Sequence, residues 1–193
     1  MERIICFGDS ITACSSLPDS HRWVSHLQAA LDAAAPGHFQ VFNRGVGGDT
    51  TYDGLKRFDS AVLPLLPGWV LIEFGFNDAS VSPGRRSARV PLPAYREFLE
   101  DILRLVRKQG GRPILIGNHP IRKDRPTPQG NRRSYWRNGA PYRPVVHELA
   151  KKTRTPLIDL EAALSTVPLE ELVTEDGLHL SASGCCLMPA PFL

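Results

Sequence analysis

Short apolar runs alternate along this chain with longer amphipathic segments. Five runs have the length and composition of buried strands: residues 3–7, 40–42, 69–73, 113–116 and 156–160. Between them, apolar side chains three and four positions apart predict helices over 23–35, 51–63, 94–109 and 144–152, with two short helices over 160–165 and 168–173. Strands that alternate with helices pair in parallel through right-handed crossovers. The pattern therefore predicts an α/β fold, a three-layer α/β/α sandwich with a five-stranded parallel sheet, as a single domain over residues 1–193.

Composition agrees with a self-contained domain. The chain has 193 residues, of which 42% are hydrophobic, which suffices for a core of its own. No apolar run approaches the ~18 residues of a membrane span, and the amino terminus lacks the apolar stretch of a signal peptide, so we expect a cytoplasmic protein. The four cysteines, Cys6, Cys14, Cys185 and Cys186, show no Cys-x-x-Cys spacing and are expected to be reduced thiols.

Positive charge is concentrated in one segment. The net charge of +3 is too small to indicate nucleic-acid binding by itself. In residues 121–143, however, seven Lys and Arg accompany a single Asp, and prolines and glycines interrupt any apolar period. We interpret this segment as a long basic loop, either a solvated excursion or a substrate lid that includes Arg132, Arg133, Tyr135 and Trp136. RNA binding, with Tyr135 and Trp136 as stacking platforms, is an alternative, but we expect no nucleic-acid partner.

Small polar residues follow the predicted strands. Residues 8–10, 43–50, 75–78 and 117–120 follow the first four strands, and residues 176–179 stand near the carboxyl end of the chain. Ligands of open parallel sheets bind outside the carboxyl ends of the strands. We therefore expect these residues to converge on one edge of the sheet.

Their types suit acyl transfer. A serine hydroxyl becomes a nucleophile when a base takes its proton and a third group holds that base. Ser10 follows a strand, His179 is the candidate base, and Asp176 is placed to hold the ring of His179. The oxyanion of a tetrahedral intermediate needs donors, for which the Ser10 N–H, a glycine N–H of the Gly47-Gly48 turn and the Asn77 amide are candidates. Each residue alone has an ordinary structural explanation, such as a helix cap or a turn, but together they supply complementary roles.

Four blocks of this sequence resemble those of the SGNH hydrolases, also called GDSL esterases and lipases. Gly8-Asp9-Ser10 resembles the nucleophile block, and residues 43–50 resemble the glycine block, with Gly48 as the oxyanion glycine. Residues 75–78 resemble the Gly-x-Asn-Asp block, and residues 176–179 resemble the Asp-x-x-His block. The resemblance spans residues 3–184. It implies a flavodoxin-like sheet and hydrolysis of small carboxylic esters or thioesters through a seryl acyl-enzyme, without a metal or another cofactor. By the same resemblance, Asp9 orders the turn around Ser10.

Two features depart from the family pattern. Only 14 residues follow His179, Pro189 and Pro191 interrupt them, and Ser181 can cap only a shortened helix. We expect the sheet to be thinly covered there, with apolar surface available to a homodimer partner. The basic loop is the second departure, and it leaves the substrate open between esters with an anionic leaving group and neutral sugar acetates.

Two other functions remain as alternatives. Metallophosphoesterases have metal-binding blocks that are similar to Gly8-Asp9 and Gly117-Asn118-His119. The first strand of this chain lacks their Asp-x-His, however, and Pro120 stands where an acidic residue normally follows. A catalytically inactive SGNH-like binding module is the second alternative, because the shortened carboxyl end can misplace His179. Hydrolysis that depends on Ser10 discriminates between this module and an esterase.

Overall fold

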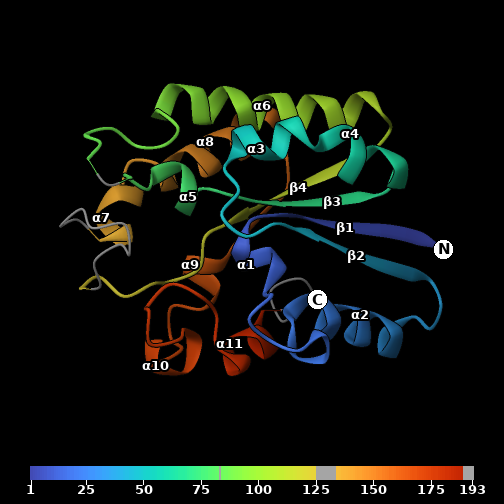
Figure 1. The fold of residues 1–193 in the computed structure, drawn as a ribbon. Coiled ribbons are helices and arrows are strands. Elements are labelled where there is room, and N and C mark those ends of the chain that lie inside the picture. Colours follow the sequence, from blue (N-terminus) through green and yellow to red (C-terminus); the bar gives the residue numbers. More distant parts are fainter. Residues whose placement is uncertain (83, 125–133, 189–193) are drawn as a thin grey trace.

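The computed structural model describes residues 1–82, 84–124 and 134–188. It contains a five-stranded parallel sheet of order β2-β1-β3-β4-β5, formed by β1 (Glu2–Gly8), β2 (Phe39–Gly45), β3 (Trp69–Glu73), β4 (Arg112–Gly117) and β5 (Leu157–Asp159). This is the flavodoxin-like order, whose switch point lies between β1 and β3. Figure 1 shows the carboxyl ends of the strands gathered on one side of the molecule. The predicted fold class is confirmed.

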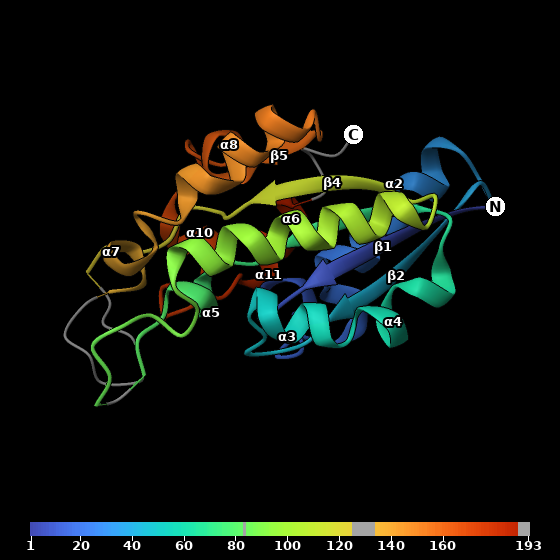
Figure 2. The same ribbon diagram turned by 90° about the horizontal axis from the view of Figure 1, so that it is seen from above.

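Helices cover both faces of the sheet. One face carries α3 (Thr51–Lys56), α4 (Phe58–Ala61), the 3-10 turn η2 (Leu63–Leu65), α6 (Leu92–Lys108) and α8 (Arg143–Thr153), and Figure 2 shows α6 lying between α3 and α8. The other carries α1 (Ser10–Ala13), η1 (Asp19–His21), α2 (Trp23–Ala34), α9 (Leu160–Ala163), α10 (Leu169–Leu172) and α11 (Ala182–Leu187). The short helices α5 (Phe76–Ala79) and α7 (Tyr135–Gly139) lie at the carboxyl edge of the sheet.

Successive side chains of a strand point to opposite faces of the sheet, so each strand contributes to two hydrophobic cores. Ile5 and Phe7 of β1 pack toward α6 and α8, whereas Ile4 and Cys6 pack toward α2 and α11. All four side chains are buried. Burial of both faces explains why β1 reads as one continuous apolar run.

Two local predictions were wrong. The helix expected over 51–63 is broken at Arg57, whose backbone leaves the helical region and whose side chain turns back to the strand ends. The segment 121–143, expected to be loop throughout, contains α7, because the Ser134 hydroxyl caps it by accepting from the Arg137 N–H.

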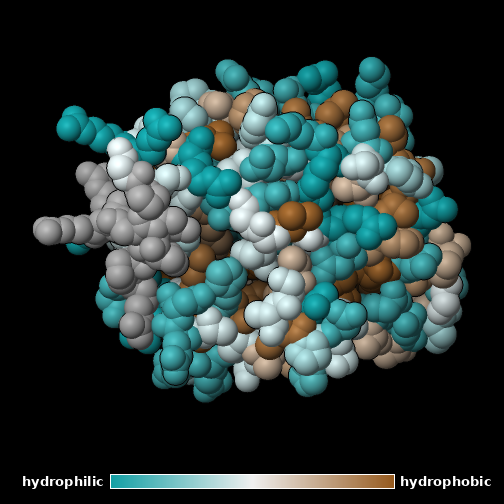
Figure 3. Space-filling view, viewed as in Figure 1, coloured by the Kyte–Doolittle hydropathy of each residue, from teal (hydrophilic) through white to brown (hydrophobic). Residues whose placement is uncertain are grey.

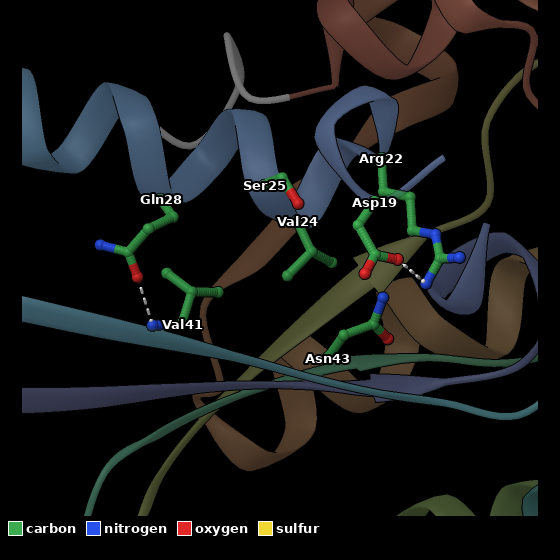
Figure 4. A pocket seen from close by; sticks show the side chains of 7 residues that line it. All are labelled: Asp19, Arg22, Val24, Ser25, Gln28, Val41 and Asn43. Carbon is green, nitrogen blue, oxygen red and sulfur yellow. Dashed lines mark hydrogen bonds and ion pairs between the residues drawn. The ribbon is translucent and has the colours of Figure 1, made fainter. Parts of the chain in front are cut away.

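The outer edge of β2 is covered by a side chain of α2. The Gln28 Nε2 donates to the Phe39 carbonyl at 3.1 Å, and the Gln28 Oε1 accepts from the Val41 N–H at 2.7 Å. Figure 4 shows the second contact beside a pocket of about 340 Å³ that also involves Asp19, Arg22 and Asn43. Because unpaired edge strands attract other strands, this amide protects β2.

An apolar recess opens on the α2 side of the sheet. It has a volume of about 250 Å³ and is lined by Ile4, Leu27, Leu31, Phe39, Trp69, Leu71, Ile114 and Ile158. Figure 3 shows apolar surface where α2 meets β2. The homodimer expected from the sequence stays a prediction. Within the described residues, no helix has the length and apolarity to cross a bilayer.

Candidate active site

Ser10 stands at the carboxyl end of β1, where the strand turns directly into α1. The carboxylate of Asp9 caps α1 by accepting from the Ile11 N–H at 2.9 Å. Gly45 lets α1 approach the end of β2, since a Cβ at Gly45 would lie 2.2 Å from the backbone nitrogen of Ala13. The turn therefore presents a half-buried hydroxyl at the edge of the sheet.

His179 and Asp176 meet Ser10 from the far end of the chain. The Ser10 Oγ lies 2.9 Å from the His179 Nε2, and the His179 Nδ1 lies 2.6 Å from the Asp176 Oδ2. If Asp176 accepts the Nδ1 hydrogen, Nε2 is free to accept the hydroxyl proton of Ser10. The structure thus brings the three predicted side chains together in the order that a nucleophile, a base and an orienting acid require.

The turn that holds Asp176 is tightly bonded. The Asp176 Oδ1 accepts from the Leu178 N–H at 2.8 Å, the His179 N–H at 3.0 Å and the Thr174 hydroxyl at 2.8 Å. Burial acts to raise the pKa of Asp176, but the hydrogen bonds from His179 and the backbone outweigh it and lower the pKa to about 2. Asp176 is therefore ionised at neutral pH.

His119 supports the same turn from the end of β4. It is 2% exposed, and its Nε2 donates to the Leu178 carbonyl at 2.8 Å. Burial lowers the pKa of His119 to about 4. His119 is therefore neutral at neutral pH and fixes the residue that precedes His179.

The expected oxyanion donors lie beside Ser10. A Cβ at Gly47 would be 4.0 Å from that of Ser10, which places the glycine turn next to the nucleophile. Gly48 has φ +83°, a conformation that side chains rarely adopt and that favours glycine at this turn. The Asn77 Nδ2 donates to the Asp9 Oδ2 at 3.0 Å. Since an amide has two N–H groups, this bond leaves one N–H of Asn77 for an oxyanion.

Asp9 is itself held by a second buried carboxyl group. Glu73 ends β3, is 1% exposed and hydrogen-bonds to Asp9. Two carboxyl groups bond to each other only if one is protonated. Burial, followed by the charge of Asp9, raises the pKa of Glu73 well above its usual value, whereas burial raises the pKa of Asp9 only to about 7. Burial therefore favours one proton shared by the Glu73 and Asp9 pair.

Arg57 joins the nucleophile turn to the glycine turn. Its Nε donates to the Asp49 carboxylate at 2.6 Å, and its Nη1 and Nη2 donate to the carbonyls of Arg44 and Gly8 at 2.9 Å. The guanidinium also lies over the ring of Phe7, 4.6 Å from its centroid. One side chain thus fixes the ends of β1 and β2 and the residue that follows Gly48 in the glycine turn.

The expected lid residues are placed only in part. Arg132 and Arg133 lie outside the described residues. Tyr135 is 9% exposed and belongs to the apolar core, so it contributes packing instead of an exposed platform. Trp136 is half-buried, with Lys123 5.1 Å and Arg143 5.3 Å from its ring centroid.

Glu73 and Arg57 were not predicted as site residues, and His119 was expected at the edge of the sheet without a role in the site. Glu73 is an acidic residue at the end of an apolar strand, and that contrast is a signal of a buried, bonded carboxyl group. Arg57 and His119 carry no such local signal, because only the fold brings their partners to them: the Asp49 carboxylate and the carbonyls of Arg44 and Gly8 for Arg57, and the Leu178 carbonyl for His119. In the part of the chain that the structure describes, no three His, Cys, Asp or Glu residues cluster as metal ligands, so nothing favours the metallophosphoesterase alternative.

Comparison with known proteins gives matches over most of the chain. The model of the GDSL-like Lipase/Acylhydrolase family matches residues 6–185. An uncharacterized lipoprotein of Bacillus subtilis, YqeF, is 30% identical, with 82% of this chain and 70% of that protein covered. An acetylxylan esterase of Geobacillus stearothermophilus is 26% identical, with 100% and 92% covered. The solved structure of a lipase/acylhydrolase from Enterococcus faecalis has a TM-score of 0.80 at 32% identity, covering 100% of this chain and 93% of that one.

Proposed function

Since this chain belongs to the GDSL-like lipase/acylhydrolase family, we propose that it is a carboxylic ester hydrolase that works through a seryl acyl-enzyme. The observation that carries the mechanism is the chain of hydrogen bonds from Ser10 through His179 to Asp176. A hydroxyl, an imidazole and a carboxylate in this order form the minimal set for nucleophilic acyl transfer.

In the first half-reaction, the His179 Nε2 takes the proton of Ser10 while the Ser10 Oγ attacks the ester carbonyl. Asp176, ionised because its pKa is about 2, stabilises the imidazolium that forms. His179 then protonates the leaving alcohol or thiol, and the acyl group remains on Ser10. Water, activated by the same imidazole, releases the acid and restores the enzyme.

The charge that develops on the carbonyl oxygen needs preorganised donors. We assign this role to the N–H groups of Ser10 and Gly48 and to the free N–H of Asn77. Asp9 contributes indirectly, because its carboxylate holds the other N–H of Asn77 and the first turn of α1. Arg57 holds the turn that contains Ser10 and the turn that contains Gly48 next to each other, because it binds a residue of each.

The open surroundings of the site favour a substrate whose leaving group extends into solvent. Among the described residues, Asp176 is exposed and Ser10 and His179 are half-buried, so solvent reaches the triad. The similarity to an acetylxylan esterase supports short acyl groups on a sugar. Esters and thioesters with anionic leaving groups are the second substrate class, motivated by the basic segment 121–143.

The test is hydrolysis of p-nitrophenyl acetate by the wild type and by Ser10→Ala, at neutral pH with excess EDTA. We expect turnover by the wild type and a loss of several orders of magnitude in kcat for Ser10→Ala. Ser16→Ala, the same substitution at an exposed serine nearby, is the matched control and is expected to keep full activity.

A Ser10→Ala variant that retained wild-type kcat would contradict the proposal. If the wild type does not turn over acetate, a serine-directed fluorophosphonate probe separates the two remaining cases. Labelling at Ser10 indicates an active site with a narrower substrate. Absence of labelling in folded protein contradicts the esterase mechanism and favours the inactive binding module.

A further inference from the structure

Two thiols face each other in the core between α1 and α11. The Cys14 Sγ and the Cys185 Sγ are 3.3 Å apart, and all four cysteines are free thiols. Cys14 is 6% exposed and Cys185 is fully buried. Cys14 immediately follows α1, the helix that begins with Ser10, whereas Cys185 lies in α11, a few residues after His179. The pair therefore joins the two segments that carry the proposed nucleophile and base.

The geometry suits bond formation. Disulfide sulfurs lie about 2.05 Å apart, so the two sulfurs must approach by a little over 1 Å. α11 has only six residues and packs against α10, α2 and η1. Movement of so short an element costs less than displacement of a strand.

The two thiols also differ in their hydrogen bonds. The Cys14 Sγ donates to the Ile11 carbonyl at 3.2 Å as well as facing Cys185, and the hydrogen bond with Cys14 lowers the pKa of Cys185 although burial opposes this. Thiolate is the form that reacts with oxidants, and we assign the first step to Cys185. Cys186 is exposed and its Sγ lies 3.2 Å from the His26 Nε2 instead, in a separate environment.

We propose that Cys14 and Cys185 form a reversible disulfide when the protein meets hydrogen peroxide, an oxidant close to water in size. The thiolate of Cys185 attacks one oxygen of the peroxide, the O–O bond breaks, and the hydroxide that leaves takes a proton to become water. Cys14 then attacks the sulfenic acid at Cys185, and its S–H proton leaves with the hydroxyl as a second water. Two thiols thereby lose two electrons and two protons, and one peroxide gives two waters.

The disulfide stabilises the fold more than a local cross-link would. It closes a loop that runs from residue 14 to residue 185, nearly the whole chain. Closing a long loop removes much of the entropy of the unfolded chain. We expect the Tm to rise by roughly 5–10 °C on oxidation and to return when dithiothreitol is added.

The experiment treats the folded, reduced protein with hydrogen peroxide, alkylates the remaining thiols and maps the peptides under non-reducing conditions. The expected product has one cross-link, between Cys14 and Cys185, and an intact mass lower by two hydrogens. Cys185→Ser and Cys186→Ser form a matched pair at adjacent positions. The first should abolish the cross-link and the rise in Tm, and the second should keep both.

The peptide map of the wild type decides the question even if Cys185→Ser does not fold. A cross-link to Cys186, oxidation of single cysteines to sulfinic acid, or unmodified Cys14 and Cys185 in folded protein would each overturn the proposal. None of these readouts depends on hydrolysis. A negative result here therefore contradicts the disulfide without bearing on the esterase mechanism, and the reverse also holds.

Discussion

Asp9 offers the sharpest test of how the oxyanion donors are held. Its two carboxylate oxygens accept from two different donors, the Ile11 N–H at 2.9 Å and the Asn77 Nδ2 at 3.0 Å. Asp9→Asn has the same shape but only one acceptor oxygen. One of the two donors must then face an NH2 group, in a place where residue 9 is fully buried.

The size of the effect follows from the lost bond. A hydrogen bond to a charged acceptor contributes about 1.5–3 kcal/mol, and about 1.4 kcal/mol corresponds to a tenfold change in rate. If the loss falls on the Asn77 amide, kcat drops by roughly 10- to 150-fold. Complete removal of this donor in Asn77→Ala should cost about 10²–10³-fold.

The assay is a double-mutant cycle on kcat for p-nitrophenyl acetate. Where the lost acceptor is the one that holds the Asn77 amide, Asp9 acts through Asn77, and the double variant should be no slower than Asn77→Ala alone. Asp78→Asn is the matched control, since Asp78 is equally buried but accepts from the Thr51 N–H and hydroxyl at 3.0 and 2.5 Å. Asp78→Asn keeps one oxygen for both Thr51 donors and should keep kcat within about threefold. Multiplicative losses in the double variant would refute the reasoning.

Two further predictions concern the turn around His179. Asp176→Asn keeps an oxygen for the backbone of the turn but turns an NH2 group toward the His179 Nδ1, so the ring adopts the wrong tautomer. We expect kcat to fall about 10³–10⁴-fold with little change in Tm. A fall in kcat of less than about tenfold would contradict the role of Asp176. For His119, burial lowers the pKa from 6.5 to about 4, so the unfolded chain binds a proton first and stability is lost as the pH falls through this window. His119→Gln cannot titrate, and between pH 7 and pH 4.5 its unfolding free energy in urea should fall by roughly 2–3 kcal/mol less than that of the wild type. If both proteins lost the same unfolding free energy between these pH values, His119 would not be the cause of the loss.

Much of the fold could be predicted from the sequence, because strands and helices leave hydrophobic patterns within short segments of the chain. The continuous apolar runs at residues 3–7 and 69–73 belong to β1 and β3, which are buried on both faces and therefore show no polar alternation. The position of Ser10 and Asn77 after such runs followed from the rule that parallel strands end on one edge, whereas Asp176 was identified by its spacing of three residues from His179. The errors were local too: the break at Arg57 and the helix α7 depend on single side chains that override composition.

What the sequence by itself determined was the order of the elements and the kinds of side chain available at the edge of the sheet. Only the tertiary structure decided which side chains touch. Three contacts join residues far apart in the chain: Glu73 with Asp9, Arg57 with the Gly8 carbonyl, and Cys14 with Cys185. No periodicity records such pairs, because each depends on how strands and helices pack in three dimensions. Buried carboxyl groups and thiols acquire their roles from those neighbours, through desolvation and hydrogen bonding that exist only in the folded chain.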